Sequence, residues 1–136
     1  MSRLRAVFSL LCIVSFLALF GCGSSGGKPT AHLRGTVTIG GQSIPADAEA
    51  SVTFKPTKSG QARSTSAIIT NGMYDAPDVP LGPVTAYVSV QQATGREVTE
   101  NVSRPYKEYR SLVPSKYVDG IPLEVSGDSA NQDFKL

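Results

Sequence analysis

Apolar and polar residues alternate along most of the chain beyond residue 30. Between residues 31 and 39, Leu33, Val37 and Ile39 fall on one side and polar residues on the other, which is typical of a half-buried strand. The same two-residue period predicts further strands over 50–56, 62–70, 73–76, 84–90, 121–125 and 133–136. Because the first half of segment 62–70 is small or polar, we expect that strand either at a sheet edge or with one loosely packed face.

Turn-forming residues separate these segments. The glycines at 40–41 and the pair Asn71-Gly72 tolerate positive φ and predict tight turns. Pro77 is expected to end the strand that follows the second turn, with Tyr74 pointing inward. Short strands separated by turns, with no amphipathic helix between them, predict an all-β fold: an antiparallel β-sandwich of about seven strands.

The first 20 residues follow a different pattern. Arg3 and Arg5 make the start of the chain basic, and residues 6–20 then contain no charged side chain. This run is shorter than the ~20 residues that a bilayer-spanning helix needs, and it lacks the polar face of a core helix. We therefore expect an N-terminal signal helix that directs export, rather than a transmembrane anchor.

Residues 19–22, Leu-Phe-Gly-Cys, resemble the lipobox of bacterial lipoproteins. The resemblance implies that lipid, such as palmitate, is attached at Cys22 and that a lipoprotein signal peptide, residues 1–21, is removed. Cys12 would leave with the signal, so the exported chain keeps one cysteine, which cannot form an internal disulfide. Ordinary cleavage, with Cys22 left as a free thiol, is the alternative.

The composition after the apolar run bears on location and partners. Residues 22–30 are rich in glycine and serine and predict a flexible tether from the lipidated cysteine to a domain over 31–136. Gly23 is not a retention signal of the aspartate type, which by analogy with other lipoproteins favours the outer membrane, facing the periplasm or the exterior. The chain has 13 Lys and Arg and 11 Asp and Glu. Loss of Arg3 and Arg5 leaves the exported domain formally neutral, so we expect no nucleic-acid partner.

Segment 98–120 is long for a connection between strands, which usually takes ~4–6 residues. Leu112, Val113 and Tyr117 would pack it as a strap across the end of a sheet in one interpretation. In the other, its aromatic and basic side chains stack on and hydrogen-bond a ligand or partner. The candidate contact residues are Arg104, Tyr106, Tyr109, Arg110 and Tyr117.

Several short motifs occur in order along the domain. After a strand and hairpin over 34–45 come Ala-x-Val-x-Phe-x-Pro at 50–56, Thr-Asn-Gly-x-Tyr at 70–74 and Val-Pro-x-Gly at 79–82. These motifs resemble those of transthyretin-like, carboxypeptidase-regulatory-like β-sandwich domains. Motifs at 113–117 and 131–136 resemble the version found in small lipoproteins of planctomycete-type bacteria. The resemblance implies a non-catalytic, Ig-like sandwich module and assigns no active-site residue.

Candidate chemistry is sparse. The single histidine, His32, falls on the outward side of the first strand, and we interpret it as a solvated residue. One histidine and one lipidated cysteine do not make a usual zinc site, and Asp75 with Asp78 supplies too few oxygens for calcium. No Gly-x-Ser-x-Gly elbow for a serine nucleophile is present. We therefore expect no enzyme activity and no catalytic, cofactor-binding or metal-binding residue.

Together, the signal, the neutral domain and the sparse chemistry predict a non-catalytic, lipid-anchored module of the cell envelope with a structural or protein-interaction role. The membrane is the expected partner of Cys22, and an envelope protein or a glycan is the expected partner of the domain. The alternative is a carbohydrate- or peptide-binding module that uses segment 98–120 as its contact surface.

Overall fold

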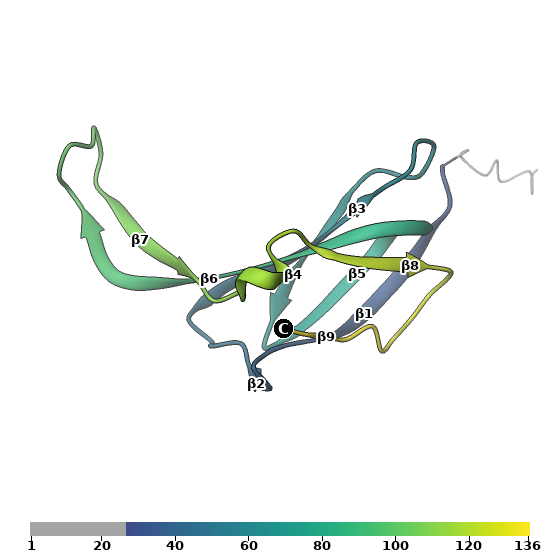
Figure 1. The fold of residues 1–136 in the computed structure, drawn as a ribbon, viewed down its shortest axis with the longest axis horizontal. Coiled ribbons are helices and arrows are strands. Elements are labelled where there is room, and N and C mark those ends of the chain that lie inside the picture. Colours follow the sequence, from purple (N-terminus) through teal and green to yellow (C-terminus); the bar gives the residue numbers. More distant parts are fainter. Residues whose placement is uncertain (1–26) are drawn as a thin grey trace, which may run out of the picture.

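The alternating segments form one curled, mainly antiparallel sheet in the computed structural model, which describes residues 27–136 (Figure 1). The elements are β1 (Thr30–Ile39), β2 (Gln42–Ser43), β3 (Ala48–Pro56), β4 (Thr65–Thr70), β5 (Met73–Pro80), β6 (Gly82–Val98), β7 (Tyr106–Ser111), a short 3₁₀ helix (Ser115–Tyr117), β8 (Ile121–Val125) and β9 (Phe134–Lys135). The order along the sheet is β2-β1-β5-β4-β3-β6-β7, with β8 paired to β6 and β9 paired in parallel to β1. The all-β prediction is confirmed, whereas the expected signal helix and Cys22 lie outside the described residues.

The inward residues of the strands meet in an aromatic core. Phe54 of β3, Tyr74 of β5 and Phe134 of β9 are buried, with ring centroids 5.8–6.2 Å apart. Such tilted aromatic pairs contribute about 0.5–1.5 kcal/mol each beyond the burial of their area. Tyr74 points inward, as predicted, and its hydroxyl donates to the backbone carbonyl of Gln132 at 2.7 Å. Burial raises the pKa of Tyr74, which keeps this donor protonated.

Both predicted glycine turns are confirmed. Gly40 and Gly41 have φ values of 57° and 78° and join β1 to β2. Asn71 and Gly72 have φ values of 52° and 74° and join β4 to β5. Positive φ at both central residues is the turn geometry that matches the right-handed twist of a hairpin, which explains why these residue types stand there.

The middle of the sheet differs from the expectation in two ways. β4 is not an edge strand, because it pairs with β3 along most of its length and with β5 at its last two residues. Beyond those two pairs, β4 and β5 are no longer paired with each other. β5 also continues through Pro77 to Pro80. Pro77 is tolerated because β4 has already left one side and the register with β1 shifts between Ala31 and Leu33 on the other, so no ladder bond needs its N–H.

Segment 98–120 is not an irregular loop throughout, contrary to the sequence-based interpretation. β6 extends to Val98, and β7 returns alongside it. Both faces of β7 are largely exposed, so no apolar period marks it in the sequence. The packed-strap prediction is confirmed for Leu112, Val113 and Tyr117, whose side chains pack against the core.

Candidate functional site

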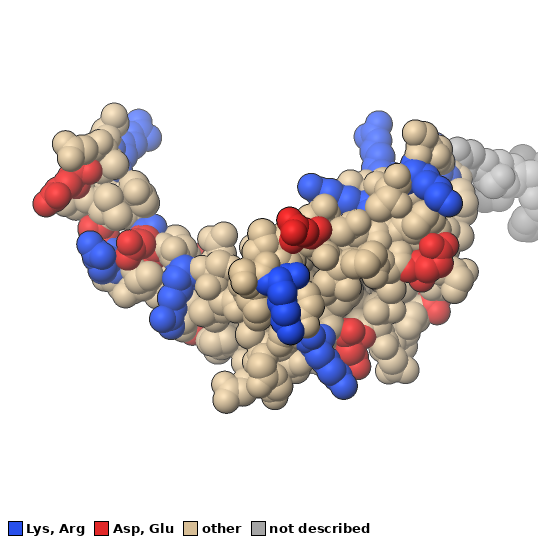
Figure 2. Space-filling view, viewed as in Figure 1, with Lys and Arg blue, Asp and Glu red and all other residues tan. Residues whose placement is uncertain are grey.

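The distal part of β6 and the whole of β7 project from the body as a two-stranded arm, residues 93–111 (Figure 1). β6 pairs with β3 as far as Gln92, and beyond that residue it pairs with β7 alone. Residues 99–105 connect the two strands at the tip. Most of the arm is exposed, and on the face shown in Figure 2 it carries both acidic and basic side chains. Among the described residues, no second layer covers this ribbon.

Side-chain hydrogen bonds hold the root of the arm against the body. Gln92 Nε2 donates to Asp47 Oδ2 at 2.9 Å, and Arg110 Nη2 donates to Gln92 Oε1 at 2.8 Å. The hydroxyl of Tyr109 lies 3.5 Å from Glu49 Oε1. Each exposed contact contributes about 1 kcal/mol or less, but together they fix the direction in which the arm leaves the body.

A bulge interrupts the β6 side of the arm. The register between β6 and β7 shifts between Ala93 and Glu97, and Gly95 has a φ of 80°. Thr94 Oγ1 donates to Glu108 Oε2 at 2.7 Å, and Arg96 Nη1 lies 3.8 Å from the same oxygen. Through these contacts, Glu108 of β7 holds the bulged segment of β6 in place. A bulge bends its strand and disrupts the ladder, so the arm has one irregular edge and one regular edge.

Four of the five candidate contact residues lie on the arm. Arg104 is in the tip, and Tyr106, Tyr109 and Arg110 are in β7. Tyr106 and Tyr109 are 54% and 42% exposed. Because they are three residues apart in one strand, their side chains point to opposite faces and do not form a single stacking platform. Tyr117 is separate from them: it packs in the strap, and its hydroxyl donates to a backbone carbonyl of β9 at 3.3 Å.

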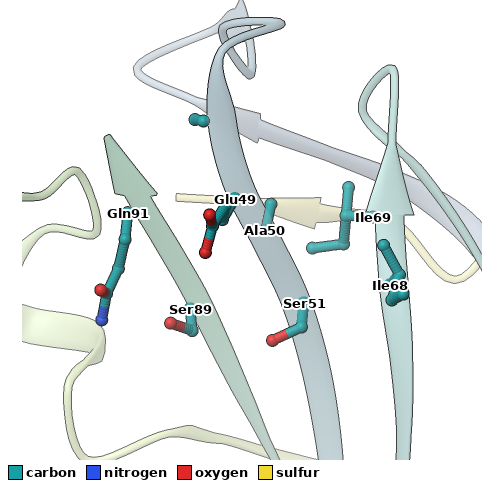
Figure 3. Close-up of a pocket in the computed structure, with 8 residues that line it drawn as sticks. Glu49, Ala50, Ser51, Ile68, Ile69, Ser89 and Gln91 are labelled. Carbon is teal, nitrogen blue, oxygen red and sulfur yellow. The ribbon is translucent and has the colours of Figure 1, made fainter. Parts of the chain in front are cut away.

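A shallow hollow lies where β3 and β4 part, at the side of the sheet shown in Figure 3. It has a volume of about 420 Å³ and is lined by Ala48, Glu49, Ala50, Ser51, Ile68, Ile69, Ser89 and Gln91. Glu49 is the one ionisable residue in this lining, so the hollow offers no second titratable group with which it could exchange a proton. The lining can hydrogen-bond a neighbour, but it does not provide an acid–base pair.

One ionic cluster was not foreseen from the sequence. His32 Nε2 lies 2.5 Å from Asp75 Oδ1, and Arg34 Nε lies 2.9 Å from Asp75 Oδ2. The interpretation of His32 as a merely solvated residue is therefore wrong, because its side chain pairs with Asp75. The hydrogen bond from His32, followed by the charge of Arg34, holds the pKa of Asp75 below its usual value. The register of β1 on β5 places Arg34 directly opposite Asp75, and that register cannot be deduced from the spacing of the residues.

The lowered pKa of Asp75 predicts a pH dependence of stability. Its carboxylate stabilises the fold above its unfolded pKa of about 3.9, and this contribution is lost as the pH falls through the lower folded value. Asp75→Asn should therefore lower the melting temperature at pH 7, and the difference from the wild type should disappear once the pH falls below the folded pKa of Asp75. Thermal unfolding followed by circular dichroism across this range measures the difference.

The matched control for this experiment is Asp78→Asn. Asp78 is on the same strand, and its side chain makes no ion pair within residues 27–136. This variant should keep the pH dependence of the wild type. A difference in melting temperature between Asp75→Asn and the wild type that stayed constant at every pH would contradict the assigned role of Asp75.

Among residues 27–136, no group of three or more His, Cys, Asp or Glu side chains is placed to hold a metal ion. The same part of the chain has no helix long and apolar enough to cross a membrane. Comparison with protein-family models, with curated proteins and with solved structures gave no match to this chain.

Proposed function

We propose that the chain is a non-catalytic, lipid-anchored module of the bacterial cell envelope that presents the arm to a protein partner. The observation that carries the proposal is the isolation of residues 93–111, which extend beyond the body as two strands. A two-stranded ribbon is at best marginally stable by itself in water. Contact with a partner would order such a ribbon and cover its unpaired strand edges, so the arm is better suited to binding than to supporting the body.

The position of the start of β1 agrees with this role. The lipid is proposed to be attached at Cys22, and residues 22–30 would lead from it into β1. In Figure 1 the first residues of β1 lie at the right end of the molecule and the arm lies at the left end. A lipid-anchored domain with this layout can hold the body near the membrane while the arm extends away from it.

The finer fold assignment, two facing layers as in transthyretin-like domains, is part of the proposal. It is supported by the aromatic cluster, to which Phe54 comes from β3 and Tyr74 from β5. β3 pairs with β4 and β6, whereas β5 pairs with β1 and only briefly with β4. Rings that meet across a core from two parts of a sheet are what a sandwich requires.

Binding of a carbohydrate or peptide by the aromatic side chains of segment 98–120 stays a prediction. The separation of Tyr106 from Tyr109 by strand alternation, and of both from Tyr117, gives no shared platform on which a ring could stack. The geometry therefore favours the arm as a protein-contact element.

Photo-crosslinking in cells tests the contact role. A photo-crosslinking amino acid at position 106, in the arm, should form adducts with a discrete partner, because the Tyr106 side chain is 54% exposed. The control position is Val118, which lies off the arm and is 65% exposed. Adducts from position 106 alone would support the proposal. Absence of adducts from position 106, or the same adducts from both positions, would overturn it.

A further inference from the structure

The two edges of the arm differ in their ability to accept another strand. On the β6 side, the bulge over residues 94–96 breaks the regular spacing of donors and acceptors. On the β7 side, Tyr106–Ser111 is a regular strand without proline or glycine. Beyond Ser111 the chain turns into the packed strap. The free edge is therefore short, regular and bounded at its C-terminal end by the body.

The hydrogen-bonding direction of this edge follows from one contact. The N–H of Leu112 donates to the carbonyl of Val90 at 2.9 Å, so Leu112 faces β6. In an antiparallel ladder, residues that face one neighbour alternate with residues that face the other. Arg110 therefore also directs its backbone groups to β6. Tyr109 and Ser111 direct theirs to the free edge, where a further strand can pair with them.

The charges along this edge are self-complementary. The order from position 107 is Lys-Glu-Tyr-Arg-Ser, which places opposite charges symmetrically on either side of Tyr109. If a second β7 pairs antiparallel about a two-fold axis at Tyr109, Glu108 lies opposite Arg110 of the second copy, and the reverse pair forms as well. Lys107 then lies opposite the uncharged Ser111 of the second copy. Opposite charges on directly facing residues stabilise a strand pair.

Neighbouring symmetric registers lack this match. Centring the pair on position 108 places Glu108 opposite its own copy, and centring it on position 110 does the same for Arg110. Centring it on position 107 places two lysines together and brings Pro105, which has no N–H, into the ladder. Like charges on facing residues are destabilising, so the charge pattern selects the register centred on Tyr109.

We infer that the arm pairs with the arm of a second copy of this chain, β7 against β7 about Tyr109, to form a continuous sheet across a two-fold axis. This inference rests on the contact role proposed above and names the partner. About six backbone hydrogen bonds form across the axis in this arrangement, from Lys107, Tyr109 and Ser111 of each copy. The two Glu108–Arg110 pairs set the register. They use the second carboxylate oxygen of Glu108 and the remaining guanidinium donors of Arg110, since Glu108 Oε2 is bonded to Thr94 and Arg110 Nη2 to Gln92 within the same arm.

Charge reversal with rescue tests the inference on the full chain in detergent, by sedimentation velocity. The wild type should dimerise. Glu108→Arg and Arg110→Glu should each weaken dimerisation by about tenfold or more, since each places like charges together at both symmetric contacts. The double variant restores opposite charges and should restore the dimer. Glu100→Arg makes the same charge change in the tip, off the free edge, and should leave the dimer intact.

Cysteine crosslinking gives a second readout that does not depend on the charges. Facing hydrogen-bonded residues have Cα atoms about 5.5 Å apart, within the range that a disulfide bridges. Tyr109→Cys should give a covalent dimer on mild oxidation, beyond any that the wild type forms, and Thr99→Cys in the tip should not. A monomeric wild type, or a double reversal that fails to restore the dimer, would overturn the inference. A monomer whose position 106 still crosslinks to another protein would leave the contact role standing.

Discussion

Alanine at position 35 is expected to destabilise the fold by about 3–5 kcal/mol, which corresponds to a fall in melting temperature of about 10–20 °C. A Cβ added to Gly35 would lie 2.0 Å from the carbonyl oxygen of Gln132, which is backbone and cannot rotate away. Relief of this clash must move the segment that leads into β9. That movement also breaks the hydrogen bond from Tyr74 to the same carbonyl and disturbs the packing of Phe134 in the aromatic cluster.

Two further variants separate the clash from other effects. Gly127→Ala adds the same methyl group where no atom lies within 4 Å, so it should unfold at the wild-type temperature. Tyr74→Phe removes only the hydrogen bond to Gln132 and should cost about 1–2 kcal/mol. Urea unfolding of the three variants gives the free energies. A loss below about 1 kcal/mol for Gly35→Ala would show that the segment before β9 does not approach β1 as closely as described.

The strands that the sequence predicts are those with one buried and one exposed face. Val84, Ala86 and Val90 of β6 are buried at alternate positions, and this period is readable without knowledge of the neighbours. The turn at Asn71-Gly72 is equally local, because the need for positive φ restricts the residue types. Alternation of buried residues and the residue types of tight turns are both local features of the sequence, which is why the all-β class could be predicted.

Features that depend on register or on distant chain segments were not predictable. Gly35 lies within the predicted strand at 31–39, but nothing near it in the sequence indicates that the backbone at Gln132 passes over it. The pairing of His32 with Asp75 likewise depends on how β1 is aligned with β5. A residue spacing of 43 along the chain carries no information on that alignment.

The candidate site was likewise predictable only in part. The concentration of aromatic and basic residues in segment 98–120 predicts Tyr106 and Tyr109 as contact residues, and the structure places both on one projecting element. The arm itself gave no signal, because a strand exposed on both faces has no apolar alternation. Tyr117 is close to them in the sequence, whereas its packing against the core separates it from them in the structure.

Replacement of Cys22 with alanine is expected to abolish lipid attachment completely. Labelled palmitate, supplied to bacteria that process lipoproteins, should enter the wild-type protein and be absent from Cys22→Ala. One acyl chain binds a bilayer only marginally, whereas two or three chains, at about 0.8 kcal/mol per buried CH₂, give a lasting anchor. Loss of the label therefore reports the loss of that anchor.

Cys12→Ala is the matched control, since it removes the other cysteine of the chain and leaves Cys22 in place. It should be labelled and membrane-bound like the wild type, because residue 12 is expected to depart with residues 1–21. Label that persists in Cys22→Ala, or that is lost in Cys12→Ala, would contradict the assignment of the lipid to Cys22. An unlabelled wild type with an intact amino-terminal methionine would remove the anchor altogether. The contact role proposed for the arm rests on residues 93–111, so that proposal would survive this result and would then apply to a protein that is not tethered by lipid.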